Sequence, residues 1–264
     1  MNQRENLLRA VRFETPEAIP MVFHINPACW QHYPHDALQE LVSAHPLLFP
    51  DFAPLAQVTP TFSPVQRRDE PYRDPWGCVW HTSEDGITGT VTEHPLADWK
   101  SFTKFRPPDI LRKTRWGEDR EDWDTIKRRL EEQKMKGVLA TVRIPCFFDR
   151  LHYLRGFENL LCDFATDPPE LSKLIEMVLE ANLKLISKLL ELGADLVDHH
   201  GDIGTQRALM MKPETFRKYL KPSYARMFQP FPKDPAAMAG VPPLICKPRQ
   251  PRPALQSLRN GVQS

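Results

Sequence analysis

The sequence lacks any run of 18 or more apolar residues, the minimum for a membrane-spanning helix. Its first residues carry charges where a signal peptide has an apolar core. Neither charge is in excess, since 35 basic residues stand against 34 acidic ones. These absences predict a cytoplasmic protein with no membrane partner. They also predict no nucleic-acid partner, because no basic surplus is present to neutralise phosphates.

Paired cysteines are absent as well. The five cysteines are scattered along the chain without a C-x-x-C motif. In a reducing compartment such cysteines are typically buried or unreactive thiols, not disulfides or a zinc knuckle. The spacing of the cysteines therefore gives no evident cofactor-binding motif.

The composition is that of a globular protein, with 41% apolar and 26% charged residues. The length of 264 residues suits one α/β barrel domain or two small domains. Disorder of the whole chain is excluded on these grounds.

The first half of the sequence predicts both helices and strands. Residues 3–13 predict an amphipathic helix, residues 19–23 a strand that runs into His24, and residues 36–43 a helix. Between residues 72 and 93, two β-rich runs at 79–82 and 87–91 flank Glu84-Asp85-Gly86, a turn signal. We interpret 72–93 as a hairpin excursion that is not part of a barrel.

The second half predicts a parallel βαβ unit. A charged helix ends at Gly137 and is followed by a strand at 138–144. Apolar residues then repeat every three or four positions from Pro169 to Leu192, where Asp167 can cap the helix, and a strand follows at 194–200. Strand, long helix and strand are typical of parallel sheets.

Composition changes after Phe228. Residues 229–264 are rich in proline, have no acidic residue after Asp234 and show no helical or strand period. We therefore expect a disordered tail there, following a folded domain at 1–228. An alternative is a proline-rich ligand for an SH3-like groove.

Catalytic residues of parallel barrels lie at the carboxyl ends of strands. This rule selects His24, Arg143 at the end of the strand at 138–144, and the segment that follows this strand, which contains Tyr153 and Arg155. Tyr153 and Arg155 offer a hydroxyl and a cation to an anionic substrate. The alternative is a helix that buries its apolar residues and leaves its arginines solvated, and for Arg155 we prefer it.

The densest group of polar residues runs from Asp198 to Gln206. Because strand side chains alternate, Asp198 and His200 share one face and His199 points to the other. An Asp–His pair suits general acid–base catalysis, whereas two histidines with an aspartate could bind a metal if further ligands were supplied. Glycines in the group, at 201 and 204, allow sharp turns next to a ligand.

At these residues the chain resembles the uroporphyrinogen decarboxylase family, including its corrinoid-linked methyltransferases. The similarity covers roughly residues 3–228. It rests on RENLLRAVRFETPEAIPMVF, DPWGCVWHTSEDGITGTVTEHPLADW, LRGFENLLCDFATDPPEL and LGADLVDHHGDIGTQRALMMKPETFRKYLKPSY. The last two blocks are the most specific, and they look closest to the methyltransferase-like branch.

The resemblance implies a TIM (β/α)8 barrel, here incomplete, with an inserted hairpin. It implies either a lyase of porphyrin metabolism that decarboxylates a tetrapyrrole-like acid, or a methyltransferase that uses zinc and a corrinoid. The small-molecule substrate would be a tetrapyrrole or a methyl donor. Implied or selected site residues are His24, Tyr153, His200, Asp202 and Gln206.

Two departures from the family limit this assignment. An arginine-rich loop should follow the first strand, but His24-Ile25-Asn26-Pro27 stands there. The His-x-Cys zinc motif belongs to the family's C-terminal half, and no match to it is found after Phe228. The family's chain should run on for about a hundred residues, so we expect a truncated chain with impaired activity. The alternative is a non-catalytic remnant or interaction module.

Overall fold

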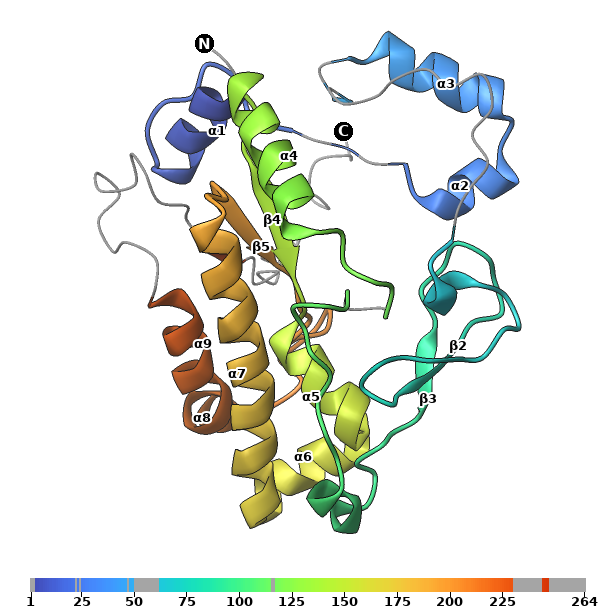
Figure 1. Ribbon diagram of the computed structural model, residues 1–264, viewed down its shortest axis with the longest axis vertical. Helices are drawn as coiled ribbons and strands as arrows, with labels where there is room; N and C mark the ends of the chain where they lie inside the picture. Colours follow the sequence, from blue (N-terminus) through green and yellow to red (C-terminus); the bar gives the residue numbers. More distant parts are fainter. Residues whose placement is uncertain are drawn as a thin grey trace, which may run out of the picture.

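The computed structural model describes residues 3–21, 23, 25–46, 48–49, 62–114 and 117–229, and the backbone of 244–246. Figure 1 shows helix α7 running alongside strands β4 and β5, with α9 on its outer side and the hairpin strands β2 and β3 on the opposite side of the molecule. No described helix combines the length and the hydropathy that crossing a membrane requires.

A parallel sheet forms the centre of the molecule. Strands β4 (Thr141–Ile144) and β5 (Leu196–His199) pair in parallel, and β6 (Leu244–Cys246) pairs in parallel with β5. Helices α5 (Phe147–Arg155), α6 (Phe157–Thr166) and α7 (Pro169–Glu191) make the crossover from β4 to β5. The predicted βαβ unit is therefore confirmed.

Strand β6 corrects one expectation. We predicted no strand within 229–264, yet Leu244–Cys246 pairs with β5 in register with residues 197–199. The strand Leu-Ile-Cys has only three residues, which is too short for the periodicity of apolar residues to reveal it. The rest of the proline-rich segment after residue 229 lies outside the described residues.

Helix α7 is the longest element, and its packing follows the predicted pattern. Its buried residues recur every three or four positions, so one face packs into the core. Its N-cap is Pro168, so the prediction that Asp167 caps it is wrong. Asp167 instead ends α6 in the left-handed conformation, with φ 52°, and its carboxylate accepts a bond from Lys218 Nζ at 2.7 Å. The buried residues are Leu171, Leu174, Ile175, Val178, Leu179, Asn182, Leu185, Ile186 and Leu189.

The predicted hairpin is present as part of an antiparallel sheet. Strand β2 (Val79–His81) pairs with β3 (Thr90–Glu93), and a short strand not predicted from the sequence, β1 (Tyr72–Arg73), pairs with β2. Gly86 supplies the positive φ of 79° that the turn requires. The strands of the described residues thus form two three-stranded sheets, without closure into a barrel.

The predicted strand at residues 19–23 is wrong. Ile19, Met21 and Phe23 belong to no strand and are 80%, 52% and 51% exposed. The Phe23 N–H donates to Leu48 O in the following loop, so its backbone is paired outside any sheet. An apolar run of this length does not specify its pairing partner, which only tertiary contacts supply.

The remaining N-terminal helices lie around these sheets. Helix α1 (Gln3–Val11) packs Leu8 against Leu139 and Leu196, at the start of β4 and β5. Arg4 Nη2 also donates to Asp195 Oδ1 at 2.8 Å. The other elements before β4 are α2 (Pro27–His32), α3 (His35–Ala44), η1 (Pro64–Gln66), η2 (Trp99–Thr103) and α4 (Trp123–Met135).

The C-terminal helices contain a π-helical turn. Helix α8 (Pro213–Thr215) leads into the π-helical segment η3 (Phe216–Leu220) and then α9 (Lys221–Phe228). Pro222 has no N–H to donate to the carbonyl four residues earlier, and its ring crowds that carbonyl. The backbone widens accordingly, so that the Lys221 N–H donates to Phe216 O, five residues earlier.

Candidate functional site

The carboxyl ends of β4 and β5 bring an arginine beside an aspartate. In the parallel register Arg143 lies directly beside Asp198, and Ile144 lies beside His199. Arg143 Nε and Nη2 each lie 3.1 Å from Asp198 Oδ2. The Arg143 side chain is 53% exposed, so this cation faces solvent while one of its edges is held by the carboxylate.

His200 completes this exposed group. Its Nε2 lies 2.6 Å from Asp198 Oδ1 and 2.7 Å from Oδ2, and its side chain is 57% exposed. The structure therefore confirms that Asp198 and His200 share one face of the strand. A carboxylate in this position orients the imidazole, as general acid–base catalysis requires. We call Arg143, Asp198 and His200 the exposed triad.

His199 points to the opposite face and is buried. The Phe147 N–H donates to His199 Nε2 at 3.2 Å, which requires a neutral ring with its proton on Nδ1. Burial lowers the pKa of His199 from 6.5 to about 4; the Asp149 carboxylate opposes this shift and His200 adds to it. This histidine is therefore neutral at pH 7.

A second Asp–His pair lies on α5. Asp149 Oδ1 is 3.8 Å from His152 Nε2, and both side chains are largely buried. A methyl group placed on Gly201 would lie 3.9 Å from Asp149 Oδ1, 3.8 Å from His199 Cε1 and 3.7 Å from Cys146 Cβ. The loop after His200 therefore passes directly over the first turn of α5. Sequence reasoning missed Cys146, Asp149 and His152, although they follow a strand end and the strand-end rule could have selected them.

Tyr153 lies on the hairpin side of α5. Its ring packs edge-on against Trp80, with centroids 4.8 Å apart, and against His152, with centroids 4.5 Å apart. It is half-buried. His152 in turn lies 3.8 Å from Asp149, the residue of α5 next to the Gly201 loop.

The other residues selected from the sequence are placed less closely. Asp202 and Gln206 are exposed, and Gln206 lies at the tip of a turn in which Thr205 Oγ1 accepts from the N–H groups of Arg207 and Ala208. Neither is brought against Tyr153 or His200 in the contacts of the described residues. His24 lies outside the described residues.

The arginines of α5 are buried. Phe147, Phe148, Leu151 and Leu154 are fully buried, as a helix in this position predicts. The expectation that the arginines would be solvated is wrong, because Arg155 is 8% exposed and bonds to Asp163 at 2.6 Å. Its guanidinium also stacks 4.2 Å from the Trp99 ring, so Arg155 holds α5, α6 and η2 together and offers no cation to a substrate.

The described residues do not fit a zinc ion. Among them, no three His, Cys, Asp or Glu side chains converge as a set of metal ligands. His199 Nε2 accepts an N–H bond and His200 Nε2 is held by Asp198, so their geometry is that of hydrogen-bonded imidazoles.

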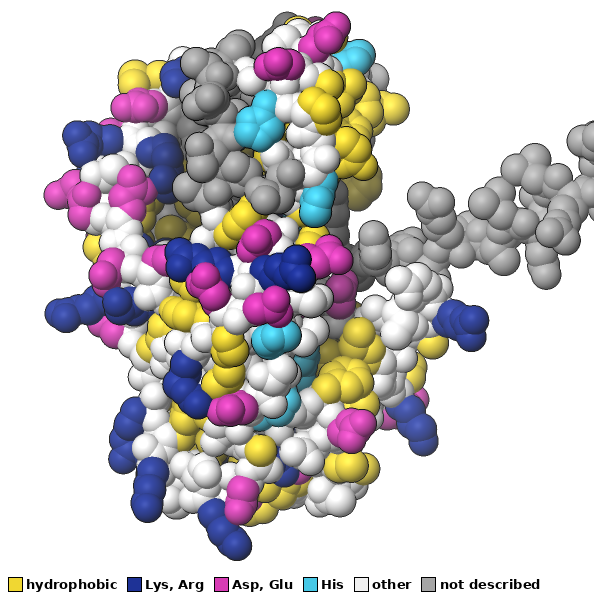
Figure 2. All heavy atoms as spheres, turned by 90° about the vertical axis from the view of Figure 1, so that its right-hand side faces the viewer, with side chains coloured by type: hydrophobic (Ala, Val, Ile, Leu, Met, Phe, Trp, Pro, Cys, Tyr) yellow, Lys and Arg dark blue, Asp and Glu magenta, His cyan; other side chains and the backbone are white. Residues whose placement is uncertain are grey.

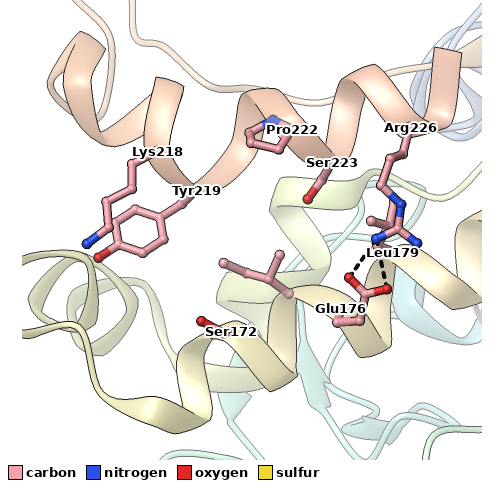
Figure 3. A pocket seen from close by; sticks show the side chains of 9 residues that line it. Ser172, Glu176, Leu179, Lys218, Tyr219, Pro222, Ser223 and Arg226 are labelled. Carbon is pink, nitrogen blue, oxygen red and sulfur yellow. Dashed lines mark hydrogen bonds and ion pairs between the residues drawn. The ribbon is translucent and has the colours of Figure 1, made fainter. Parts of the chain in front are cut away.

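Two hollows lie along α7, away from these strand ends. One, of about 230 Å³, lies between α7 and the η3–α9 segment (Figure 3). Its charged groups are paired: Arg226 bonds to Glu176 at 2.7 Å and Lys218 bonds to Asp167 at 2.7 Å. The other, a groove of about 800 Å³, lies between α7 and residues 107–110. Neither is lined by the exposed triad.

The face of the molecule shown in Figure 2 carries charges of both signs. On the face shown in Figure 2, Lys and Arg side chains alternate with Asp and Glu, and histidines lie between them in the central part. A surface of mixed sign provides no extended patch for a polyanion.

A sequence model of the family "Uroporphyrinogen decarboxylase (URO-D)" matches residues 76–245, more than half of the chain. The chain belongs to the uroporphyrinogen decarboxylase family. The match reaches β6, which corrects the expected end of similarity at residue 228, and it begins at residue 76, not at residue 3. It includes the hairpin strands β2 and β3, the exposed triad and the α5 residues.

Comparison with solved structures finds a similar fold. A methyltransferase from Methanosarcina mazei superposes with a TM-score of 0.51 at 14% identity, covering 87% of this chain and 67% of that chain. At this identity the likeness concerns the fold alone. A search of curated proteins found no significant match.

Proposed function

We propose that this member of the uroporphyrinogen decarboxylase family is an enzyme that removes a carboxylate, as carbon dioxide, from a tetrapyrrole-like acid. The observation that carries the proposal is the exposed triad, which combines a solvent-facing cation with a hydrogen-bonded Asp–His pair at the end of two parallel strands. In this fold, strand ends are where catalytic groups gather.

Each member of the triad has a role in this reaction. Arg143 binds a substrate carboxylate through the guanidinium donors that Asp198 leaves exposed. When the C–C bond to the departing carboxylate breaks, its electron pair stays on the substrate carbon and carbon dioxide leaves. Protonated His200 then donates its proton to that carbon, and its exposure lets solvent restore the proton. Asp198 orients the imidazole through its contact with Nε2.

Methyl transfer is a second candidate. It is favoured by the likeness to the methyltransferase from Methanosarcina mazei, and zinc and a corrinoid would supply the chemistry. The described residues do not fit the zinc, so we derive no step for it. A non-catalytic interaction module is the candidate from another class.

Turnover of uroporphyrinogen by the purified chain tests the proposal. Products are oxidised and separated by their number of carboxylates. We expect Arg143→Gln to raise KM at least tenfold, and His200→Gln to lower kcat by about 10²–10⁴-fold, the usual contribution of a general acid. His81→Gln is the matched control, because His81 is also exposed beside an aspartate, 3.8 Å from Asp69, but lies on the hairpin.

The alternatives predict different results. Full turnover in Arg143→Gln or His200→Gln would overturn the assignment of the triad. An unmutated chain that neither turns over nor binds uroporphyrinogen would favour the interaction module. Methyl release from methylcobalamin to a thiol, without decarboxylation, would favour the methyltransferase.

A further inference from the structure

The first turn of α5 receives a hydrogen-bond acceptor from a different strand. The first N–H groups of a helix have no partner within it and need an acceptor from elsewhere. Cys146, at the N-cap, makes no side-chain capping bond. The Phe147 N–H, at the first helical position, instead donates to His199 Nε2 on β5.

His199 is held firmly in this position. It is 3% exposed, and its ring stands edge-on to Tyr224 of α9, with ring centroids 5.7 Å apart and an interplanar angle of 85°. One buried ring thus contacts three elements: it belongs to β5, it accepts from α5 and it packs against α9. Such a side chain has little freedom to change rotamer.

This bond joins α5 to the end of β5, next to the exposed triad. His199 directly precedes His200, so the residue that holds α5 and the residue that pairs with Asp198 are neighbours on opposite faces of β5. The first turn of α5 lies under Gly201, and Asp149 Oδ1 is 3.9 Å from a methyl placed there. Asp149 Oδ1 in turn lies 3.8 Å from His152 Nε2.

We propose that His199 is a positioning residue: by accepting the Phe147 N–H it fixes the Asp149–His152 pair beside the loop that follows His200. The two Asp–His pairs, one exposed and one sheltered, then flank the same loop. The effect on turnover rests on the proposed function, whereas the placement of α5 does not.

A pair of substitutions at one position tests this inference. His199→Leu fills similar space without an acceptor, and His199→Gln keeps an acceptor oxygen. In the full chain we measure the protection of the Phe147 amide against hydrogen exchange, the alkylation rate of Cys146, and kcat and KM for uroporphyrinogen. Cys162, which is exposed on α6, is the internal control for alkylation.

We expect His199→Leu to lower the protection of Phe147 and to raise the alkylation rate of Cys146, each at least tenfold, with Cys162 unchanged. We expect kcat to fall at least tenfold with little change in KM, and His199→Gln to recover most of each loss. Unchanged protection in His199→Leu would overturn the inference. Lost protection with unchanged kcat would also overturn it, since the bond would then be only structural.

The unmutated chain provides a second test if His199→Leu does not fold. Protonation of His199, whose pKa is about 4, removes the acceptor. The protection factor of the Phe147 amide should therefore fall selectively as the pH drops through 4. The titratable groups that act on the His199 ring are Asp149, Asp198 and His200. A constant factor would overturn the inference. If the unmutated chain shows no turnover, the proposed function fails, and exchange and alkylation alone decide the role of His199.

Discussion

Arg150 Nη1 donates to Asp74 Oδ2 at 2.8 Å across 76 positions of sequence, where the two side chains are 4% and 0% exposed. Asp74 also accepts from Trp80 Nε1 at 3.1 Å and from the Cys78 N–H at 3.0 Å. One buried carboxylate thus ties the hairpin sheet to α5, the helix that carries Asp149 and His152. The hairpin is therefore part of the support of the candidate site.

Removing this carboxylate should destabilise the fold strongly. Asp74→Ala removes the buried carboxylate that lies 2.8 Å from Arg150 Nη1, and breaking a buried ion pair typically reduces the free energy of unfolding by about 3–5 kcal/mol. Glu93→Ala is the matched control, because the Arg73–Glu93 pair has the same 2.8 Å distance but is 60% and 65% exposed. Exposed pairs contribute about 1 kcal/mol or less. Urea denaturation measures the free energy of unfolding of the two variants. Equal losses in Asp74→Ala and Glu93→Ala would contradict the burial of the Asp74–Arg150 pair.

The stability of the chain should fall in mild acid because of His199. Its pKa is about 4 in the folded chain and 6.5 when exposed, so its contribution is complete above pH 6.5 and is lost as the pH falls toward 4. Between these values only the unfolded chain binds the proton. A shift of this size corresponds to ~3 kcal/mol.

Variants separate this effect from carboxylate titration. Urea denaturation at several pH values from 7 to 4 should give a flatter dependence for His199→Gln than for the unmutated chain. His81→Gln, at an exposed histidine, should keep the steeper dependence. Parallel curves for all three proteins would show that His199 titrates normally.

Gly86 should not tolerate alanine. Its φ of 79° costs L residues about 1–2 kcal/mol, and an added Cβ would lie 2.6 Å from Ala28 N. We expect Gly86→Ala to lower the free energy of unfolding by at least that amount in thermal or urea denaturation. Gly201→Ala is the control, because a Cβ there meets only ordinary contacts at 3.7 Å or more. Equal stability of the two variants would rule out the strained turn.

Two cysteines should react very differently with alkylating agents. Burial and, to a smaller extent, the neighbouring Asp74 carboxylate raise the pKa of the Cys78 thiol to about 12. Because the thiolate is the reactive form, Cys78 should resist iodoacetamide in the folded chain and react only after unfolding. Cys162 is exposed and should react at once. Peptide mass spectrometry gives both rates, and early labelling of Cys78 would contradict its burial.

Local signals in the sequence predicted the elements that depend on local physics. The apolar period of α7 and the Asp-Gly turn between β2 and β3 are properties of neighbouring residues, and both are confirmed. The alternation of a strand was enough to place His199 opposite Asp198 and His200. The family resemblance rested on four blocks of sequence and is confirmed over residues 76–245.

Longer-range relationships were not predictable in this way. The strand expected at 19–23 has no partner in the described structure, and β6 was missed because its pairing with β5 joins distant segments. Arg155 looked like a solvated residue because nothing near it in sequence shows that Asp163 and Trp99 meet it in the core.

The sequence by itself determined helix α7, the Asp-Gly turn, the parallel βαβ unit and the strand end at which polar groups gather, because periodicity and turn chemistry act over a few residues. Tertiary structure alone decided that Arg143 meets Asp198, that His199 holds α5 and that Asp74 holds Arg150. These contacts join residues 52 to 76 positions apart. They form only when packing brings separate elements together, and no local pattern encodes which partner each side chain meets.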